Sequence, residues 1–128
     1  MSAKVLVIED NRDSRDLLHL YLTSAGFKVT MASAAAEGLY LAGSEQPDLI
    51  ISDLGLPDLD GVDLIKRLRE LPGFSLTPIL VFTALADVRA DEAIIAGANR
   101  VVPKPSDLED IVADVQALLD EAKQKGTR

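Results

Sequence analysis

The segment LIISDLGLPDLDG, residues 49–61, decides how the rest of the chain is interpreted. It starts as a continuous apolar run, reaches Asp53, and then becomes a stretch rich in proline, glycine and acidic residues. A short apolar run bounded by turn residues is typical of a strand that is covered on both faces of a sheet. The segment therefore predicts a buried strand that ends on a carboxylate at the edge of a sheet.

Four other runs have the character of strands. Residues 5–8 and 79–82 are continuous and apolar. Residues 27–31 alternate between apolar and polar side chains, and residues 101–102 form only a short pair. Continuous runs suit the covered centre of a sheet, whereas alternation suits a strand with one exposed face. We therefore expect the strands at 5–8, 49–51 and 79–82 in the centre and the other two at the edges.

Helical patterns separate these runs. They are expected at residues 12–25, 34–45, 62–71, 87–97 and 107–124. A strand followed by a helix, repeated five times, indicates a parallel sheet with helices on both faces and right-handed crossovers. The sequence thus predicts a single α/β domain, residues 1–122, followed by a polar tail at residues 123–128.

Apolar residues at helical spacing predict which helix faces are buried. In the first helix, the residues expected to face the core are Leu17, Leu18, Tyr21 and Ala25. In the helix at residues 87–97, we expect Asp87 to be the N-cap and Ile94 and Ile95 to contact the core. These assignments orient both helices on the sheet.

Composition narrows the class of protein. The chain has 128 residues, no cysteine and a formal net charge of −8. Without cysteine there is no disulfide framework, thiolate zinc site or thiol nucleophile. The negative charge disfavours nucleic acid or an anionic membrane as a partner, because both require a basic face.

No apolar stretch approaches the roughly 18 to 20 residues that span a bilayer, and the start MSAKVLVIED is unlike a signal peptide, so we expect a cytoplasmic protein.

Polar residues stand at the ends of the predicted strands. Glu9 and Asp10 follow the first strand, and Asp53 follows the third. Thr83 ends the fourth strand, and Lys104 lies just beyond the fifth. In an open parallel sheet, ligands bind outside the carboxyl ends of the strands, at the point where the strand order reverses. If the first and third strands are neighbours, we expect these side chains to converge.

The residue types in this set indicate phosphoryl chemistry. Three neighbouring carboxylates repel one another, and oxygen ligands with open, hydrated positions suit Mg²⁺. A lysine charge and a threonine hydroxyl at neighbouring strand ends complete a pocket that suits a phosphate. We therefore predict that Asp53 is a nucleophile toward phosphorus, while Mg²⁺ and Lys104 neutralise the charge that develops in the transition state.

Each of these residues also has an ordinary structural explanation. An acidic residue after a strand is most often a helix cap or a turn residue. Thr83 alone is most often a strand-end hydroxyl, and Lys104 alone a surface charge. Five such residues at four strand ends, however, favour a common site. His19, the only histidine, lies between apolar helix positions and is interpreted as a structural or surface residue.

The same segments resemble the response-regulator receiver domain of two-component signalling, including chemotaxis receivers. The resemblance covers about residues 4–119 and rests on VLVIEDN (5–11), PDLIISDLGLPDLDG (47–61), PILVFTA (78–84), AGAN (96–99) and KP (104–105). It implies a flavodoxin-like (βα)5 fold, a three-layer sandwich whose parallel five-stranded sheet has the order 2-1-3-4-5.

The resemblance also implies a role for each acidic residue. Asp53 is the phosphoacceptor. Asp10 binds Mg²⁺ directly, and Glu9 acts mainly through metal-bound water. Asp53 and the backbone carbonyl of Gly55 complete the set of protein ligands.

The resemblance also implies roles for Thr83 and Lys104. Thr83 turns its hydroxyl toward the phosphoryl group, Lys104 pairs with that group, and the peptide bond before Pro105 is cis.

The resemblance implies partners as well. The phosphoryl donor is a histidine kinase or a phosphotransfer protein, and the chain is a regulatory phosphoprotein rather than an enzyme with a separate substrate. The surface expected to meet a downstream protein comprises residues 87–97, 101–102 and 107–124, and the sequence leaves open whether the chain forms a homodimer.

One position departs from the family pattern. Many receivers have Tyr or Phe three residues before the lysine, as a side chain that rotates on activation, and here that position is Val101. A β-branched valine has few rotamers and no ring to swing between exposed and buried states. We therefore expect a muted or differently routed response at the downstream surface.

Three alternatives remain. The chain is either a stand-alone receiver, as its end soon after the last helix suggests, or a fragment of a larger response regulator or hybrid kinase. An aspartyl-phosphate phosphohydrolase of the haloacid dehalogenase kind needs a second Asp two residues after Asp53, where Gly55 stands. A flavin or nucleotide module needs a glycine-rich loop after the first strand, where Glu9, Asp10 and Asn11 would repel phosphate in the absence of a metal.

Slow hydrolysis of the acyl phosphate is the first testable expectation. Gly55 and Leu85 flank the site at positions where other receivers place polar side chains, and neither can orient an attacking water. The lifetime of phosphorylated protein in Mg²⁺ buffer measures this property. Loss of the phosphoryl group within a few seconds would contradict the expectation.

Overall fold

The computed structural model describes residues 2–126, which form five strands and five helices in alternation. The strands are β1 (Lys4–Ile8), β2 (Lys28–Ala32), β3 (Leu49–Ser52), β4 (Ile79–Thr83) and β5 (Arg100–Pro103). The helices are α1 (Arg12–Ser24), α2 (Ala35–Glu45), α3 (Gly61–Glu70), α4 (Ala86–Ala96) and α5 (Leu108–Gly126). Every predicted strand and helix is present, and their ends differ from the predicted ones by at most two residues.

The strands form one parallel sheet in the order β2-β1-β3-β4-β5. This is the predicted order, and it confirms the flavodoxin-like fold class. The alternating run and the short run form the two edges, as their patterns indicated. Because β1 lies between β2 and β3, the strand order reverses there, and the ends of the first and third strands become neighbours.

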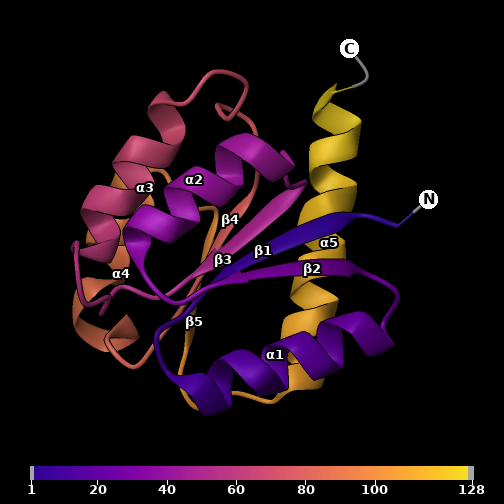
Figure 1. Cartoon of the computed structure of the whole chain (residues 1–128), viewed down its shortest axis with the longest axis horizontal. Helices are drawn as coiled ribbons and strands as arrows, with labels where there is room; N and C mark the ends of the chain where they lie inside the picture. The colour runs from indigo at the N-terminus through magenta and orange to yellow at the C-terminus, as the bar shows by residue number, and fades with distance from the viewer. Residues whose placement is uncertain (1, 127–128) are drawn as a thin grey trace.

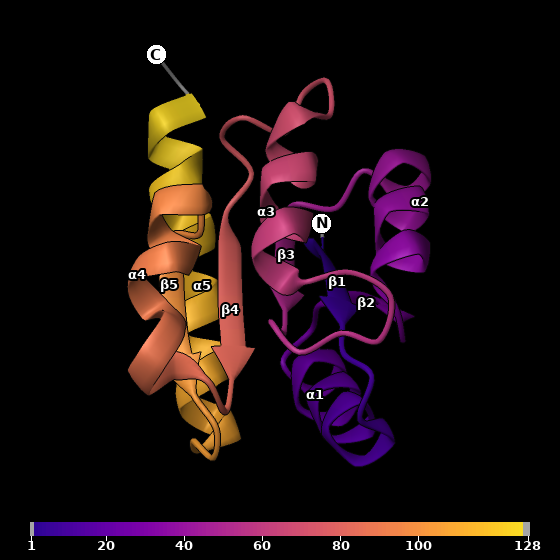
Figure 2. The same ribbon diagram turned by 90° about the vertical axis from the view of Figure 1, so that its left-hand side faces the viewer.

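Helices lie on both faces of the sheet (Figure 1). Two hydrophobic clusters fill the space between the sheet and these two helical layers. Leu6 and Ile8 of β1 belong to the cluster under α2, α3 and α4, whereas Val5 and Val7 belong to the cluster under α1 and α5. Figure 2 shows the connections that lead into α1, α3 and α4 gathered at the carboxyl ends of the strands. Since helices cover both faces, the residues that follow the carboxyl ends of the strands are among those of the sheet that remain accessible.

α1 packs on the sheet through a different face from the one predicted. Leu18 and Leu22 are buried, whereas Leu17, Tyr21 and Ala25 are exposed, so the prediction for those three residues was wrong. Leu18 and Leu22 lie one turn apart on the same side of α1 and form its narrow contact with the sheet. The helix has apolar residues on adjacent faces, and spacing alone does not determine which face meets the sheet.

α4 also differs from the prediction. It begins after Leu85 without a side-chain cap, so Asp87 lies in the first turn instead of at the N-cap. Ala93 is the buried residue of this helix, while Ile94 is 47% exposed and Ile95 is 84% exposed. The small Ala93 side chain lets the helix lie close to its neighbours, which leaves the two isoleucines at the surface.

The polar segment expected at residues 123–128 extends α5 as far as Gly126, and residues 127–128 lie outside the described part of the chain. Lys123 and Lys125 stand in the last turn, where positive charge interacts favourably with the helix dipole. Of the helices formed by residues 2–126, none combines the length and the apolar character needed to cross a membrane.

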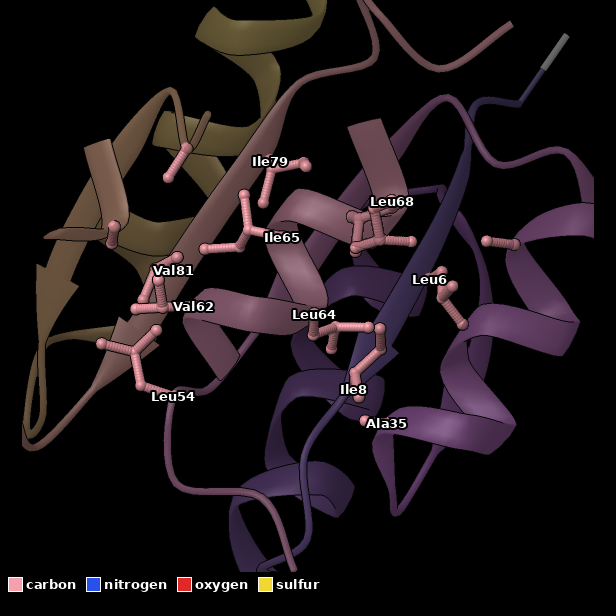
Figure 3. Packing of buried hydrophobic residues seen from close by; sticks show 14 of the residues in the cluster. Leu6, Ile8, Ala35, Leu54, Val62, Leu64, Ile65, Leu68, Ile79 and Val81 are labelled. Carbon is pink, nitrogen blue, oxygen red and sulfur yellow. The ribbon is translucent and has the colours of Figure 1, made fainter. Parts of the chain in front are cut away.

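The start of α3 approaches the end of β3 closely because residue 61 is glycine. A Cβ atom at Gly61 would collide with the Cα of Leu54 and would lie 2.5 Å from the carbonyl oxygen of Asp53. The N–H of Gly61 donates a hydrogen bond of 2.9 Å to the carbonyl of Leu54. From this start, α3 directs Leu64 and Ile65 into the core beside β1 and β4 (Figure 3).

We expect Gly61→Ala to destabilise the fold by about 1–3 kcal/mol, because the added methyl group meets backbone that cannot shift without moving the end of β3. Gly43→Ala is a matched control. Gly43 lies in α2 with open space around its Cβ position, so higher helix propensity should stabilise the protein by about 0.5–1 kcal/mol. Urea unfolding followed by circular dichroism measures both effects. An unchanged free energy of unfolding in Gly61→Ala would contradict the close approach.

Candidate functional site

The register of the sheet places Glu9 and Asp53 side by side. Ile8 of β1 pairs with Ser52 of β3, and the N–H of Asp53 donates a hydrogen bond of 3.1 Å to the carbonyl of Ile8. Glu9 and Asp53 therefore each follow directly after a paired residue. Because side chains alternate along a strand, both lie on the side that α1 and α5 cover.

Lys104 joins the two carboxylates from the far edge of the sheet. Its N–H donates a hydrogen bond of 2.9 Å to the carbonyl of Thr83, which continues the pairing of β4 and β5 past the end of both strands. Its Nζ lies 2.5 Å from Oε1 of Glu9 and 2.9 Å from Oδ2 of Asp53. The same nitrogen stands 5.3 Å from the centre of the Phe82 ring. One ammonium group thus bridges two acidic residues that follow adjacent strands.

Burial and hydrogen bonding act in opposite directions on these groups. Burial raises the pKa of Glu9 above its ordinary value, although hydrogen bonds from Lys104 and from the N–H of Asn11 oppose the rise. Burial would also raise the pKa of Asp53, but hydrogen bonds from Thr83 and Lys104 outweigh it and hold that pKa below its ordinary value. Burial lowers the pKa of Lys104, yet its bonds to both carboxylates raise it overall. Asp53 is therefore an ionised carboxylate at neutral pH, next to a charged lysine.

Three carboxylates gather at this edge. Glu9, Asp10 and Asp53 each offer an oxygen within 4.8 Å of the others, and they form the only such group within residues 2–126. Glu9 is buried and Asp53 half-buried, whereas Asp10 is exposed, so the cluster is open to water on one side. These hard oxygen donors with a hydrated side suit Mg²⁺, which keeps several of its own waters. Gly55 lies in the same exposed loop, and its N–H is 3.4 Å from Oδ1 of Asp53.

Thr83 completes the predicted set. It is buried at the end of β4, its side chain helps to lower the pKa of Asp53, and its Oγ1 accepts a bond of 3.1 Å from the N–H of Leu85. The peptide bond between Lys104 and Pro105 is cis, as the family resemblance implies. The predicted residues, referred to below as the site residues, are Glu9, Asp10, Asp53, Gly55, Thr83 and Lys104.

Arg15 supports the backbone of the acidic pair, a role that the sequence did not reveal. From α1, its Nη1 donates hydrogen bonds of 3.0 Å to the carbonyl of Glu9 and 3.4 Å to that of Asp10. Oε2 of Glu9 in turn accepts from the N–H of Asn11 at 3.0 Å. An arginine in a charged helical turn carries no pattern that distinguishes such a role from simple exposure to solvent.

Two further acids of the loop after Asp53 attach it to helices. Asp58 accepts hydrogen bonds of 2.8 and 2.9 Å from the N–H groups of Ala35 and Ala36, and so caps α2, whose own N-cap residue makes no side-chain bond. Asp60 is the N-cap of α3 and accepts from the N–H of Val62 at 2.8 Å. The role of Asp60 could be inferred from its place before a helix. The partner of Asp58 lies 23 residues earlier and leaves no local signal.

Comparison with known proteins assigns the family. The family model of the response regulator receiver domain matches residues 5–116, and the chain belongs to this family. It is 38% identical over 124 residues to the response regulator MprA of Mycobacterium tuberculosis, which covers 96% of this chain and 53% of MprA. The chain thus spans about half the length of these regulators. It is also 39% identical over 113 residues to an uncharacterized 14.6 kDa protein of Leptolyngbya boryana, covering 88% of this chain and 86% of that protein.

Solved structures agree with this assignment. A CheY-like response regulator receiver domain protein from Methanospirillum hungatei has a TM-score of 0.92 and 25% identity, covering 98% of this chain and 99% of that one. The receiver domain of the sensor histidine kinase PA1611 from Pseudomonas aeruginosa has a TM-score of 0.87 and 25% identity, covering 94% and 99%. That domain holds a magnesium ion coordinated in its active-site cleft.

Replacing Lys104 by methionine should tighten Mg²⁺ binding by about ten-fold. An ammonium group beside a bound cation opposes it, and two unit charges about 4 Å apart interact by about 1 to 4 kcal/mol, depending on the local dielectric constant. The chain has no tryptophan to report on binding, so amide chemical shifts during a Mg²⁺ titration are the suitable measurement. Asp10→Asn is the contrasting variant and should weaken binding. Unchanged or weaker binding in Lys104→Met would show that the ammonium group does not oppose the cation.

Proposed function

We propose that this chain is a phosphorylation-dependent signalling module, in which Asp53 accepts a phosphoryl group from a histidine kinase or phosphotransfer protein in a Mg²⁺-dependent reaction. The observation that carries the proposal is the setting of the Asp53 carboxylate. Its Oδ2 lies 2.9 Å from Nζ of Lys104, and oxygens of Glu9 and Asp10 lie within 4.8 Å of an Asp53 oxygen. The ionised carboxylate of Asp53 thus lies beside the positive charge of the Lys104 ammonium group and within a set of oxygen ligands suited to a metal ion.

The proposed reaction is a direct displacement at phosphorus. A carboxylate oxygen of Asp53 forms the new P–O bond as the P–N bond of phosphohistidine breaks, and the imidazole nitrogen leaves with the electron pair. Lys104 offers a positive charge and Thr83 a hydroxyl donor to the oxygens of the transferred group. Mg²⁺, when bound, supplies further neutralisation of the charge on those oxygens. The residues proposed to hold it are Glu9, Asp10, Asp53 and, through its backbone carbonyl, Gly55.

The proposed output is a change in protein contacts at the surface of α4, β5 and α5. On α4, Val88 is 75% exposed and Ile95 is 84% exposed, two turns apart on the same side of the helix. Large apolar side chains at this spacing suit a helical face that meets another protein. We propose that a downstream protein or a second copy of the chain binds there.

Intact-mass spectrometry after incubation with phosphoramidate and Mg²⁺ tests the proposed acceptor. We expect one adduct with the mass of a single phosphoryl group on the wild type and none on Asp53→Asn, because the amide lacks the nucleophilic oxygen pair of the carboxylate. Asp63→Asn removes an exposed acid from the first turn of α3 and should be modified like the wild type. An adduct on Asp53→Asn, or an unmodified wild type, would contradict the proposal.

A further inference from the structure

The loop that follows Asp53 is paired with its own far end. Gly55, a proposed metal ligand, and Asp60, the residue that caps α3, face each other across an antiparallel bridge, beside which the N–H of Gly61 donates a hydrogen bond of 2.9 Å to the carbonyl of Leu54. Asp60 is also fixed by the 2.8 Å bond that its Oδ1 accepts from the N–H of Val62. The two ends of the loop are thus adjacent, and a displacement near Gly55 would act on the backbone around Asp60.

The carboxylate of Asp60 also binds α4. Nη1 of Arg89 lies 3.0 Å from Oδ2, and Nη2 lies 3.1 Å from Oδ1, which is the two-pronged geometry in which arginine binds a carboxylate most strongly. Arg89 stands in the first turn of α4, 29 residues from Asp60, and its side chain is 23% exposed. This ion pair directly connects the loop after the phosphoacceptor with α4.

A second carboxylate makes the contact easy to break. Glu92, also on α4, lies 3.1 Å from Nε of Arg89 and 3.2 Å from its Nη2. Because Glu92 moves together with α4, the guanidinium keeps a partner when its bonds to Asp60 are lost. The large penalty for an unpaired, desolvated charge is thereby avoided. An ion pair that can break at low cost in this way is suited to a switch between two arrangements of α4.

We propose that the Asp60–Arg89 ion pair is the contact through which the loop at residues 53–60 positions α4, with Arg89 as a positioning residue that acts through Asp60. The inference rests on the proposed function, because the loop responds only if the site accepts a phosphoryl group or its mimic. Val101 packs against the core beneath α4 and has no ring to rotate. The ion pair supplies a route to α4 that does not involve that position.

Beryllofluoride, bound together with Mg²⁺, mimics the phosphoryl group. The changes that it causes in the amide chemical shifts of the full chain test this inference. In the wild type we expect changes both at the site residues and along residues 86–96. In Arg89→Gln the changes at the site residues should persist, whereas those along residues 86–96 should fall by about two-fold or more. Asp60→Asn keeps an oxygen that can cap α3 but loses the charge, and it should reproduce this result.

Two variants separate the ion pair from a general effect of charge on α4. Glu92→Gln removes the charge of the other partner of Arg89 but keeps an oxygen that can accept from the guanidinium, and it leaves the Asp60 contact in place, so its α4 response should stay well above that of Arg89→Gln. Arg89→Lys keeps the charge but not the two-pronged geometry, and should restore part of the response lost in Arg89→Gln. Partly exposed ion pairs contribute little to stability, so all of these variants should unfold close to the wild-type midpoint.

The outcomes distinguish the inference from the proposed function. A full α4 response in Arg89→Gln, or an equal loss in Glu92→Gln, would overturn the role of the ion pair and leave the proposed function standing. Absence of any change at the site residues of the wild type would instead contradict the proposed function.

Discussion

The Nζ atom of Lys104 lies between the carboxylates of Glu9 and Asp53, and the geometry of the whole sheet edge depends on this contact. The two acids follow adjacent strands whose register brings them together, while the lysine follows the strand at the edge. Without the ammonium group, and with no divalent cation in its place, two like charges would face each other in a partly buried space, and one would have to take up a proton or move away. With the ammonium group present, Asp53 stays charged and in place. Its carboxylate oxygen, together with one from Glu9 and one from Asp10, then forms a ligand set for a divalent cation.

The loop that begins at Asp53 also connects three helices. Asp58 caps α2, Asp60 caps α3 and binds Arg89 of α4, and Gly61 allows α3 to start in contact with the backbone of Asp53. A phosphoryl charge added at the carboxylate of Asp53 would therefore act on a loop that contacts α2, α3 and α4. The loop occupies the place where strand order reverses, so the topology that collects the acids also places this junction beside them.

The fold, and the gathering of Glu9, Asp10, Asp53 and Lys104 at one edge of the sheet, could be predicted because both depend on simple regularities. Continuous apolar runs require cover on both faces of a sheet, and parallel strands deliver their following residues to one edge. The helix faces were harder, since Leu17 and Ile95 are apolar yet exposed, and only packing decides which of several adjacent residues meets the sheet. The contacts of Arg15, Asp58 and Arg89 could not be read from the sequence. Their partners are set by the approach of separate segments, and a charged side chain in a turn has the same local pattern whether it is paired or solvated.

The initial rate of phosphorylation by phosphoramidate, measured against Mg²⁺ concentration, tests most directly whether Asp53 reacts only when a cation offsets the charge of its neighbours. The arrangement of the three carboxylates predicts a rate that rises with Mg²⁺, reaches saturation, and falls to background when EDTA removes the metal. A rate that is the same with Mg²⁺ and with EDTA would contradict this account of the site.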